Sequence, residues 1–293
     1  MSPLKLENLD FEKLHGLGND YIILNDLKWN IPEEKKAKLA ERLCEFHFSI
    51  GADGLIYVGA SDKADIKMRI FNDDGSEAEM CGNGIRCFAK YVYENEIVKK
   101  SKMQIETLKG IMIADLRIND EIVSQVKIDM GPPILNCEEV PVISVRNKEK
   151  CIEEPLEILD KTFIFTAVSM GNPHAIIFVE NQLDNEELEK YGSKIEVHEQ
   201  FPNKINVEFV KVQSETEATL RVFERGVGIT NSCGTGTCAA VVAGTLQGKF
   251  KENTPVVVHN DGGDLIITYT GESVYMEGLV ERSFRGIVEK ITI

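Results

Sequence analysis

Two stretches of this 293-residue chain decide the fold. The first runs from Met68-Arg69-Ile70-Phe71-Asn72 to Cys81-Gly82-Asn83-Gly84, and the second runs from Leu220-Arg221-Val222-Phe223-Glu224 to Cys233-Gly234-Thr235-Gly236. They align without a gap at an offset of 152 residues, because 233 minus 81 and 221 minus 69 give the same number. The arginine, the phenylalanine, the cysteine and both glycines of the two stretches coincide.

Two further landmarks keep nearly the same offset. Gly18-Asn19 precedes the apolar run 21–24 and matches Gly171-Asn172 before 175–179, while 55–58 matches 207–210. Three landmarks in the same order at a near-constant offset indicate that a unit of about half the chain is duplicated. The alternative is a chance similarity between glycine-rich turns.

The remaining elements are predicted from local composition. Short segments rich in β-branched and aromatic residues predict strands, and apolar residues at helical spacing predict helices at 32–48 and 185–194. Most links between strands are too short for a helical crossover, so we expect mainly antiparallel sheets. The predicted strands are 11–14, 21–25, 54–58, 66–71, 103–107, 111–116, 163–168, 175–179, 206–210, 219–223, 256–259, 265–270 and 273–278.

The stretch after each repeated cysteine is nearly all apolar or small. Segments 85–93 and 237–246 therefore predict helices that are buried on all sides. The expected fold class is α+β, with two pseudo-symmetric domains that each wrap a curved sheet around a central buried helix. We place the first domain at 1–132 plus 279–293 and the second at 133–278. Gly131-Pro132-Pro133 is the predicted linker, and the last strand is expected to return to the first domain.

The overall charge excludes some classes of function. The formal net charge of −15 argues against binding nucleic acid or an anionic membrane as the main role. No stretch approaches the ~18 apolar residues of a membrane span, and residues 1–13 lack the apolar core of a signal peptide. The expected location is the cytoplasm.

Seven cysteines are present, and an odd number in a reducing compartment predicts free thiols. No pair has the two-residue separation of a zinc knuckle, so no metal site is predicted. Cys81 and Cys233 differ from the other five cysteines because they occupy equivalent places before Gly-Xaa-Gly in the two repeated stretches. The others are expected to be small buried hydrophobes, and they are Cys44, Cys87, Cys137, Cys151 and Cys238.

Each of these two cysteines stands at a predicted helix start. A helix N-terminus offers unpaired N–H groups and partial positive charge, which can hold a carboxylate and lower the pKa of a cysteine. If the two halves face one bound ligand, the thiols reach its carbon from opposite sides. One can then remove a proton and the other return one, which inverts a tetrahedral carbon. Cys81 and Cys233 are therefore the predicted catalytic pair, with no cofactor, since no lysine has a recognisable pyridoxal phosphate context.

The chain is similar, along nearly its whole length, to the diaminopimelate epimerase family. The residues that carry this resemblance are 13–21, 51–54, 69–76, 80–87, 171–174, 224–226 and 233–236. The resemblance implies a cofactor-independent isomerase that converts LL- to meso-diaminopimelate, a precursor of lysine and of cell-wall peptide. It implies a small-molecule substrate, and it allows a homodimer.

The resemblance also implies roles for particular residues. The distal end of the substrate would contact Asn19, Asn72, Asn172, Asn206, Glu224 and Arg225, and the reacting carboxylate would contact Gly82, Asn83, Gly234 and Thr235. His174 and Glu224 would lie near the cysteines and adjust their pKa values. Some family members carry a glutamine that contacts substrate where this chain has Gly54. Taken alone, an asparagine such as Asn19 or Asn206 is more often a turn former.

Two rival functions stay open at this point. The nearest is a proline racemase or hydroxyproline epimerase, which resembles this chain around the cysteines but tends to have histidine where this chain has Asn83. The other is a non-catalytic thiol redox switch, in which Cys81 and Cys233 form a disulfide on oxidation.

Overall fold

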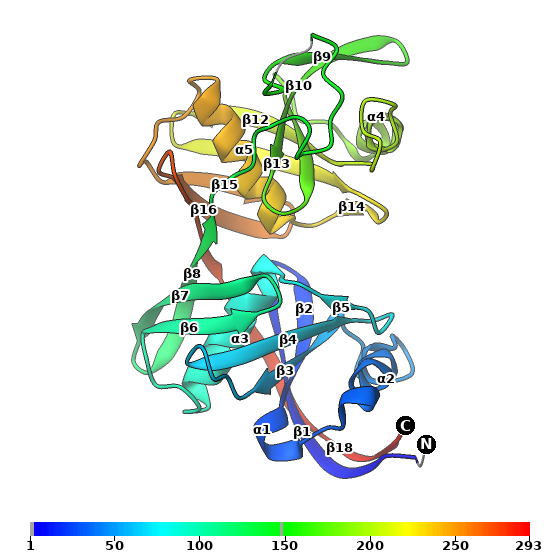
Figure 1. Ribbon diagram of the computed structural model, residues 1–293, viewed down its shortest axis with the longest axis vertical. Coiled ribbons are helices and arrows are strands. Elements are labelled where there is room, and N and C mark those ends of the chain that lie inside the picture. Colours follow the sequence, from blue (N-terminus) through cyan, green and yellow to red (C-terminus); the bar gives the residue numbers. More distant parts are fainter. Residues whose placement is uncertain (1–2, 147–148) are drawn as a thin grey trace. The chain divides into compact units, whose positions relative to one another are not determined.

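The computed structural model describes residues 3–146 and 149–293, and strands dominate it, with few helices between them (Figure 1). The chain divides into two compact units. The first unit comprises residues up to Ile128 together with Gly278–Ile293, and the second unit comprises Asp129–Glu277. Residues 1–2 and 147–148, which the predicted domains include, lie outside the described residues.

The first unit combines parallel and antiparallel strand pairs. β2–β3 and β4–β6 are parallel, whereas β1–β2, β3–β4 and β6–β7 are antiparallel. Its elements are β1 (Lys5–Gly16), β2 (Asn19–Asn25), α1 (Asp26–Trp29), α2 (Glu33–Cys44), β3 (Gly54–Gly59), β4 (Ile66–Asn72), β5 (Glu77–Ala78), α3 (Gly82–Glu94), β6 (Lys102–Thr107), β7 (Gly110–Asn119), β8 (Ile122–Gly131), which continues into the second unit, and β18 (Glu281–Thr292).

The second unit is also a mixed sheet. β11–β12 and β13–β15 are parallel, whereas β10–β11, β12–β13 and β15–β16 are antiparallel. Its elements are β9 (Glu154–Ile158), β10 (Lys161–Ser169), β11 (Pro173–Phe178), α4 (Asn185–Glu196), β12 (Asn206–Ser214), β13 (Glu217–Glu224), β14 (Gly228–Thr230), α5 (Gly234–Leu246), β15 (Val256–Asn260), β16 (Gly263–Tyr269) and β17 (Val274–Leu279).

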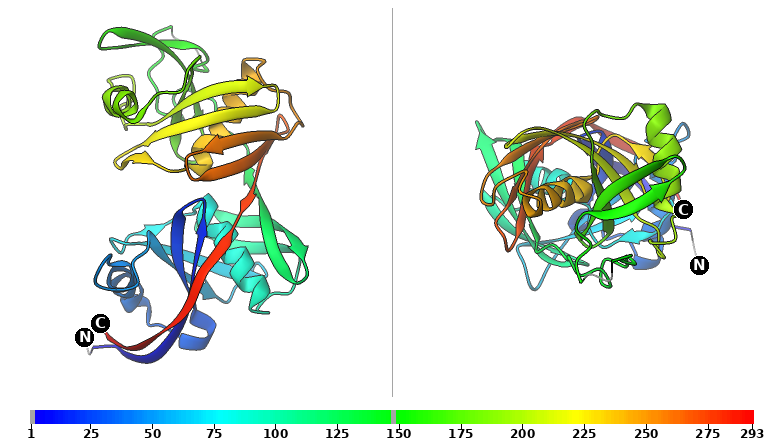
Figure 2. Two further views of the ribbon diagram at one scale, coloured as in Figure 1. Left: turned by 180° about the vertical axis from the view of Figure 1, so that it is seen from behind. Right: turned by 90° about the horizontal axis from the view of Figure 1, so that it is seen from above.

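Helices α3 and α5 are the buried centres of their units, as the sequence predicts. In α3 every residue from Gly82 to Tyr93 is buried, and the helix packs against β1, β2, β3 and β7. Helix α5 packs against β10, β11, β12 and β16 of its own unit (Figure 2). Burial on all sides explains why neither helix carries an exposed charged face.

The last strand returns to the first unit, which confirms that prediction. β18 runs antiparallel to β1 from the pair Lys5 and Thr292 to the pair His15 and Glu281. A methyl group at Gly286 would come within 2.6 Å of the Phe11 ring, so the glycine lets this ring pack against β18.

Several elements differ from the prediction. Strand β8 was not expected, although buried Val126, Ile128 and Met130 alternate along it in the pattern of a half-buried strand. The short elements α1, β5, β9 and β14 also escaped prediction. Helix α2 ends at Cys44 rather than at residue 48, because Glu45 leaves helical geometry with ψ 110°. No helix within the described residues is long and apolar enough to cross a membrane.

The prediction of free thiols is wrong for two cysteines. Cys137 and Cys151 form a disulfide in the second unit, with Cα atoms 5.7 Å apart. Both are buried in the same apolar cluster. The prediction rested on cysteine parity and compartment, and neither carries information on which side chains the fold brings together. Cys44, Cys87 and Cys238 are buried, as expected.

Candidate active site

Cys81 lies at the N-cap of α3 and is surrounded by polar groups. Its Sγ lies 3.0 Å from the Tyr21 hydroxyl and 3.6 Å from Oδ1 of Asn19. The same Oδ1 accepts hydrogen bonds from the Tyr21 hydroxyl at 3.0 Å and from Nδ2 of Asn83 at 3.3 Å. Asn19 therefore joins the thiol to the first turn of the helix.

A buried arginine fixes the start of α3. Arg86 has no exposed surface, and it donates to Oδ1 of Asn83 at 2.8 Å and to the carbonyl of Gly82 at 3.1 Å. A methyl group on Gly16 would lie 2.9 Å from this guanidinium, so β1 approaches it closely. Gly82 and Asn83, two of the four residues predicted to hold the reacting carboxylate, are thus held in place by this arginine.

Asn72 lies on β4 opposite Gly54 of β3. Its Nδ2 donates to Oγ of Ser76 at 2.9 Å. A methyl group on Gly54 would lie 2.7 Å from the carbonyl oxygen of Phe71 and 3.1 Å from the Tyr21 ring. The backbone here leaves no room for a side chain at position 54, and the ring of Tyr21 occupies the adjoining space.

Cys233 lies at the N-cap of α5 and is almost fully buried. Its Sγ accepts a hydrogen bond from the N–H of Gly236 at 3.4 Å and lies 3.4 Å from Oγ1 of Thr235. The hydroxyl of Thr237 donates to the Cys233 carbonyl at 2.8 Å. Gly234 and Thr235 form the first turn, so this helix start presents the predicted residues in the same order as α3.

A buried ion-pairing couple lies beside Cys233. Nδ1 of His174 and Oε1 of Glu208 are 2.7 Å apart, and neither side chain is exposed. Nε2 of His174 lies 3.1 Å from Oδ1 of Asn172. Burial raises the pKa of the Glu208 carboxyl, and the adjacent imidazole opposes that rise. Oε2 of Glu208 has no hydrogen-bond partner among the described residues.

His174, Glu208 and Cys233 form a compact cluster. One potential ligand atom from each lies within 4.8 Å of the others. Histidine, carboxylate and thiolate are all groups that bind zinc. The absence of a metal requirement therefore stays a prediction, to be tested on the purified protein.

The pKa of Cys233 differs from the sequence prediction. Burial raises it well above the usual range, and the negative carboxylates of Glu224 and Glu208 raise it further. The hydrogen bonds from Thr235 and Gly236 act in the opposite direction and are outweighed. The prediction that the helix start lowers the thiol pKa is wrong for Cys233, because it ignored the desolvation of a fully enclosed sulfur.

The remaining predicted residues meet at the end of β13. Asn206 donates from Nδ2 to the Pro173 carbonyl at 2.8 Å and accepts the N–H of Arg225 at 3.0 Å. The hydroxyl of Thr230 donates to Oε1 of Glu224 at 2.5 Å. The Arg225 guanidinium donates to the carbonyl of Asn203 at 3.3 Å and lies at the surface.

Sequence reasoning missed two residues of these sites. Tyr21 belongs to the apolar run 21–24, and nothing in its neighbours signals a cysteine contact. Glu208 does carry a signal, because it is a charged residue within the apolar strand segment 205–210. A buried carboxylate in such a segment requires a partner, and that requirement pointed to a site.

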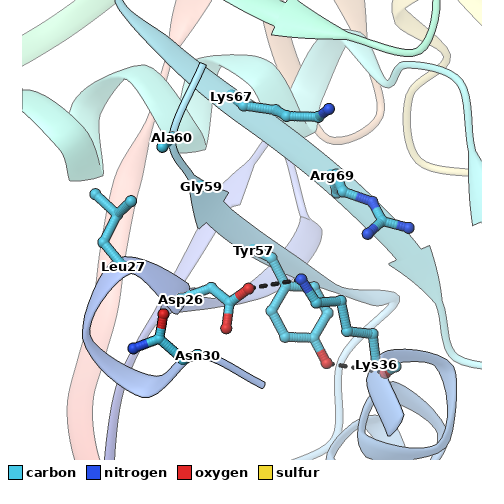
Figure 3. A pocket seen from close by; sticks show the side chains of 9 residues that line it. All are labelled: Asp26, Leu27, Asn30, Lys36, Tyr57, Gly59, Ala60, Lys67 and Arg69. Carbon is cyan, nitrogen blue, oxygen red and sulfur yellow. Dashed lines mark hydrogen bonds and ion pairs between the residues drawn. The ribbon is translucent and has the colours of Figure 1, made fainter. Parts of the chain in front are cut away.

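One pocket lies apart from these residues. Figure 3 shows it in the first unit, where Lys36, Lys67 and Arg69 reach it. Each cation already has a carboxylate partner within 3.2 Å, namely Asp26, Glu106 and Glu77 respectively. No predicted site residue lines this pocket.

Comparison with solved structures shows which proteins share this fold. A hydroxyproline epimerase from Agrobacterium vitis shares the fold with a TM-score of 0.67 at 14% identity, covering 97% of this chain and 92% of that one. A phenazine biosynthesis protein of the PhzF family from Bacillus anthracis gives a TM-score of 0.66 at 18% identity, covering 98% and 99%. A methylitaconate-delta-isomerase gives 0.69 at 12% identity, covering 99% and 96%. The fold is thus one shared by isomerases, epimerases and PhzF-family proteins.

Sequence comparison shows the family to which this chain belongs. The diaminopimelate epimerase family model matches residues 11–136 and 166–282. A diaminopimelate epimerase from Bacillus cytotoxicus is 46% identical over 285 residues, which cover 97% of this chain and 98% of the relative. One from Bacillus anthracis is 45% identical over the same length and coverage. The chain belongs to the diaminopimelate epimerase family, which confirms the resemblance seen in its motifs.

Proposed function

We propose that this chain converts LL-2,6-diaminopimelate to meso-diaminopimelate without a cofactor, with Cys81 and Cys233 as the two acid–base groups. The observation that carries this proposal is that both cysteines hold the N-cap of a buried central helix before Gly-Xaa-Gly. Membership of the family supplies the substrate, because the curated relatives carry that name.

The strand order of the two units supports a duplicated, pseudo-symmetric architecture. The pairs β1–β2, β2–β3, β3–β4, β4–β6 and β6–β7 alternate between antiparallel and parallel. The pairs β10–β11, β11–β12, β12–β13, β13–β15 and β15–β16 alternate in the same order. Tyr21 is aligned with Gly54 across the parallel strands β2 and β3, and His174 is aligned with Asn206 across β11 and β12. In this scheme Tyr21 therefore corresponds to His174, and Gly54 corresponds to Asn206.

The chemistry requires one base and one acid on opposite faces of the α carbon. The raised pKa of Cys233 keeps it protonated, so it serves as the proton donor in one direction while Cys81 accepts the α proton. In the reverse direction the roles exchange. As the proton leaves, charge moves onto the substrate carboxylate, where the N–H groups and the partial positive charge of both helix starts stabilise it.

The other residues would bind the substrate and tune the cysteines. Amide, carboxylate and guanidinium groups suit a distal end that carries both ammonium and carboxylate. His174 and Glu224 would adjust Cys233, since His174 belongs to its cluster and Glu224 raises its pKa. Distal contacts are assigned to Asn19, Asn72, Asn172, Asn206, Glu224 and Arg225, and carboxylate contacts to Gly82, Asn83, Gly234 and Thr235. A cytoplasmic location and a homodimer complete the proposal.

A substrate comparison in deuterium oxide tests this function. The purified protein is given LL-diaminopimelate, L-proline and trans-4-hydroxy-L-proline in separate reactions. We expect meso-diaminopimelate that carries solvent deuterium at the inverted α carbon, and no inversion of either ring substrate. Inversion of proline or hydroxyproline without reaction of diaminopimelate would overturn the substrate, and absence of any inversion would favour a redox role for the cysteines.

A further inference from the structure

Each cysteine has a buried partner from the equivalent strand of its unit. Tyr21 of β2 is aligned with Gly54 at the start of the pairing between β2 and β3. Its hydroxyl lies 3.0 Å from Sγ of Cys81. His174 begins the corresponding pairing of β11 and lies in the cluster around Cys233. The chain thus places a phenol beside one thiol and an imidazole beside the other.

The Tyr21 ring packs closely against two glycines of its unit. A methyl group would lie 3.1 Å from Cε1 of Tyr21 if placed on Gly54, and 3.4 Å from its Cζ if placed on Gly84. The residue as a whole is 5% exposed. A side chain enclosed in this way keeps its hydroxyl aimed at the sulfur, because the ring cannot turn away.

The side chains of Tyr21, Asn19 and Asn83 around Cys81 can keep their hydrogen bonds in either protonation state of its thiol. With Cys81 protonated, its S–H can point to Oδ1 of Asn19 at 3.6 Å. With Cys81 ionised, the Tyr21 O–H can donate to the sulfur, while Asn19 Oδ1 still accepts from Asn83. A hydrogen bond to a charged sulfur is stronger than one to a neutral thiol.

We propose that Tyr21 is a positioning residue for Cys81, whose hydroxyl fixes the sulfur and stabilises its thiolate during proton transfer. When Cys81 accepts the α proton, a sulfur electron pair forms the S–H bond and the C–H pair stays on the substrate carbon. The Tyr21 O–H bond remains intact throughout. This inference rests on the proposed function for its catalytic consequence, but the thiol–phenol contact itself does not.

Tyr21 is suited to remain a donor. Burial raises its pKa well above the usual range, and the neighbouring thiol of Cys81 raises it further. The other charged or titratable groups that act on it are Asp53 and Cys87, which also oppose ionisation of the phenol. The hydroxyl therefore keeps its proton at neutral pH.

The test compares Tyr21→Phe with a matched control, Tyr57→Phe. Tyr57 is also buried in the first unit, but its hydroxyl donates to the Lys36 carbonyl at 2.8 Å and not to a cysteine. In a Cys233→Ser background, iodoacetamide labelling of Cys81 is followed by peptide mass spectrometry across a pH series. We expect Tyr21→Phe to raise the pH midpoint of labelling by about one unit, and Tyr57→Phe to leave it unchanged.

Epimerisation is measured in parallel with Cys233 intact. Tyr21→Phe should lower kcat by about tenfold, the factor for one hydrogen bond to a charged group, with a smaller change in KM. Incorporation of 3-fluorotyrosine at position 21 keeps the donor and should restore both the labelling midpoint and kcat. An unchanged midpoint in a folded Tyr21→Phe protein, or no rescue by fluorotyrosine, overturns the positioning role.

The two proposals fail in different ways. If the native protein inverts diaminopimelate but Tyr21→Phe behaves like Tyr57→Phe, only the role of Tyr21 is lost. If Tyr21→Phe shifts the labelling midpoint while the native protein inverts no amino acid, the local role stands and the proposed function falls.

Discussion

Substitution of Gly236 by alanine tests the packing behind Cys233. A methyl group at this position would overlap Oε1 of Glu208 and would lie 2.9 Å from its Cδ. Glu208 is fully buried and cannot move aside without losing its contact with His174. The overlap costs about 1–3 kcal/mol, and separation of the buried pair costs about 3–5 kcal/mol. The gain in helix propensity from glycine to alanine offsets only about 1 kcal/mol.

The expected net loss for Gly236→Ala is therefore about 3 kcal/mol or more in the free energy of unfolding. Gly84→Ala is the matched control, because Gly84 holds the same place in α3. The nearest atoms to a methyl group there would be side-chain atoms of Ile56, Ile70 and Tyr21 at 3.3–3.4 Å, so we expect a change within about 1 kcal/mol. Urea unfolding followed by circular dichroism measures both variants. Equal stability of the two would refute the claim that Glu208 is locked against α5.

Two further predictions concern the remaining cysteines. Burial raises the pKa of Cys44 and of Cys87 to about 12 from the usual 9.0. Each buried thiol therefore contributes to the free energy of unfolding fully below about pH 9, and this contribution is lost as the pH rises towards about 12. Unfolding free energies measured from pH 8 to 11 should fall less steeply for Cys87→Ala than for the native protein, and identical slopes would contradict this. The disulfide between Cys137 and Cys151 closes a loop with a sequence separation of 14, so its reduction should lower the unfolding free energy by up to about 3 kcal/mol. The same thermal midpoint with and without dithiothreitol, confirmed by thiol counting, would show that it contributes nothing.

Much of the fold could be predicted because it follows from local patterns. The helices after Cys81 and Cys233 were visible as apolar runs that begin at Gly-Xaa-Gly, and the return of β18 followed from strand-like sequence beyond the repeated unit. Strand β8 differs from the prediction although its alternation is regular, because the glycine and prolines that follow it are also typical of a linker.

The details of the sites depended on contacts that sequence does not record. The raised pKa of Cys233 comes from enclosure and from Glu208, which approaches from β12 rather than from the helix that carries the cysteine. The contact of Tyr21 with Cys81 spans 60 positions of the chain. Local sequence identified both thiols and their helix starts, but only the packed strands show which groups set their protonation.

The central claim is that two cysteines share one inversion. The most direct measurement is the rate of LL- to meso-diaminopimelate conversion by Cys81→Ser, Cys233→Ser and the double variant, with folding confirmed by circular dichroism. Loss of a positioned acid–base group costs about 100-fold or more, so each single variant should fall at least that far, and the double variant should be no more active than either. A double variant that retains the native rate would contradict the account.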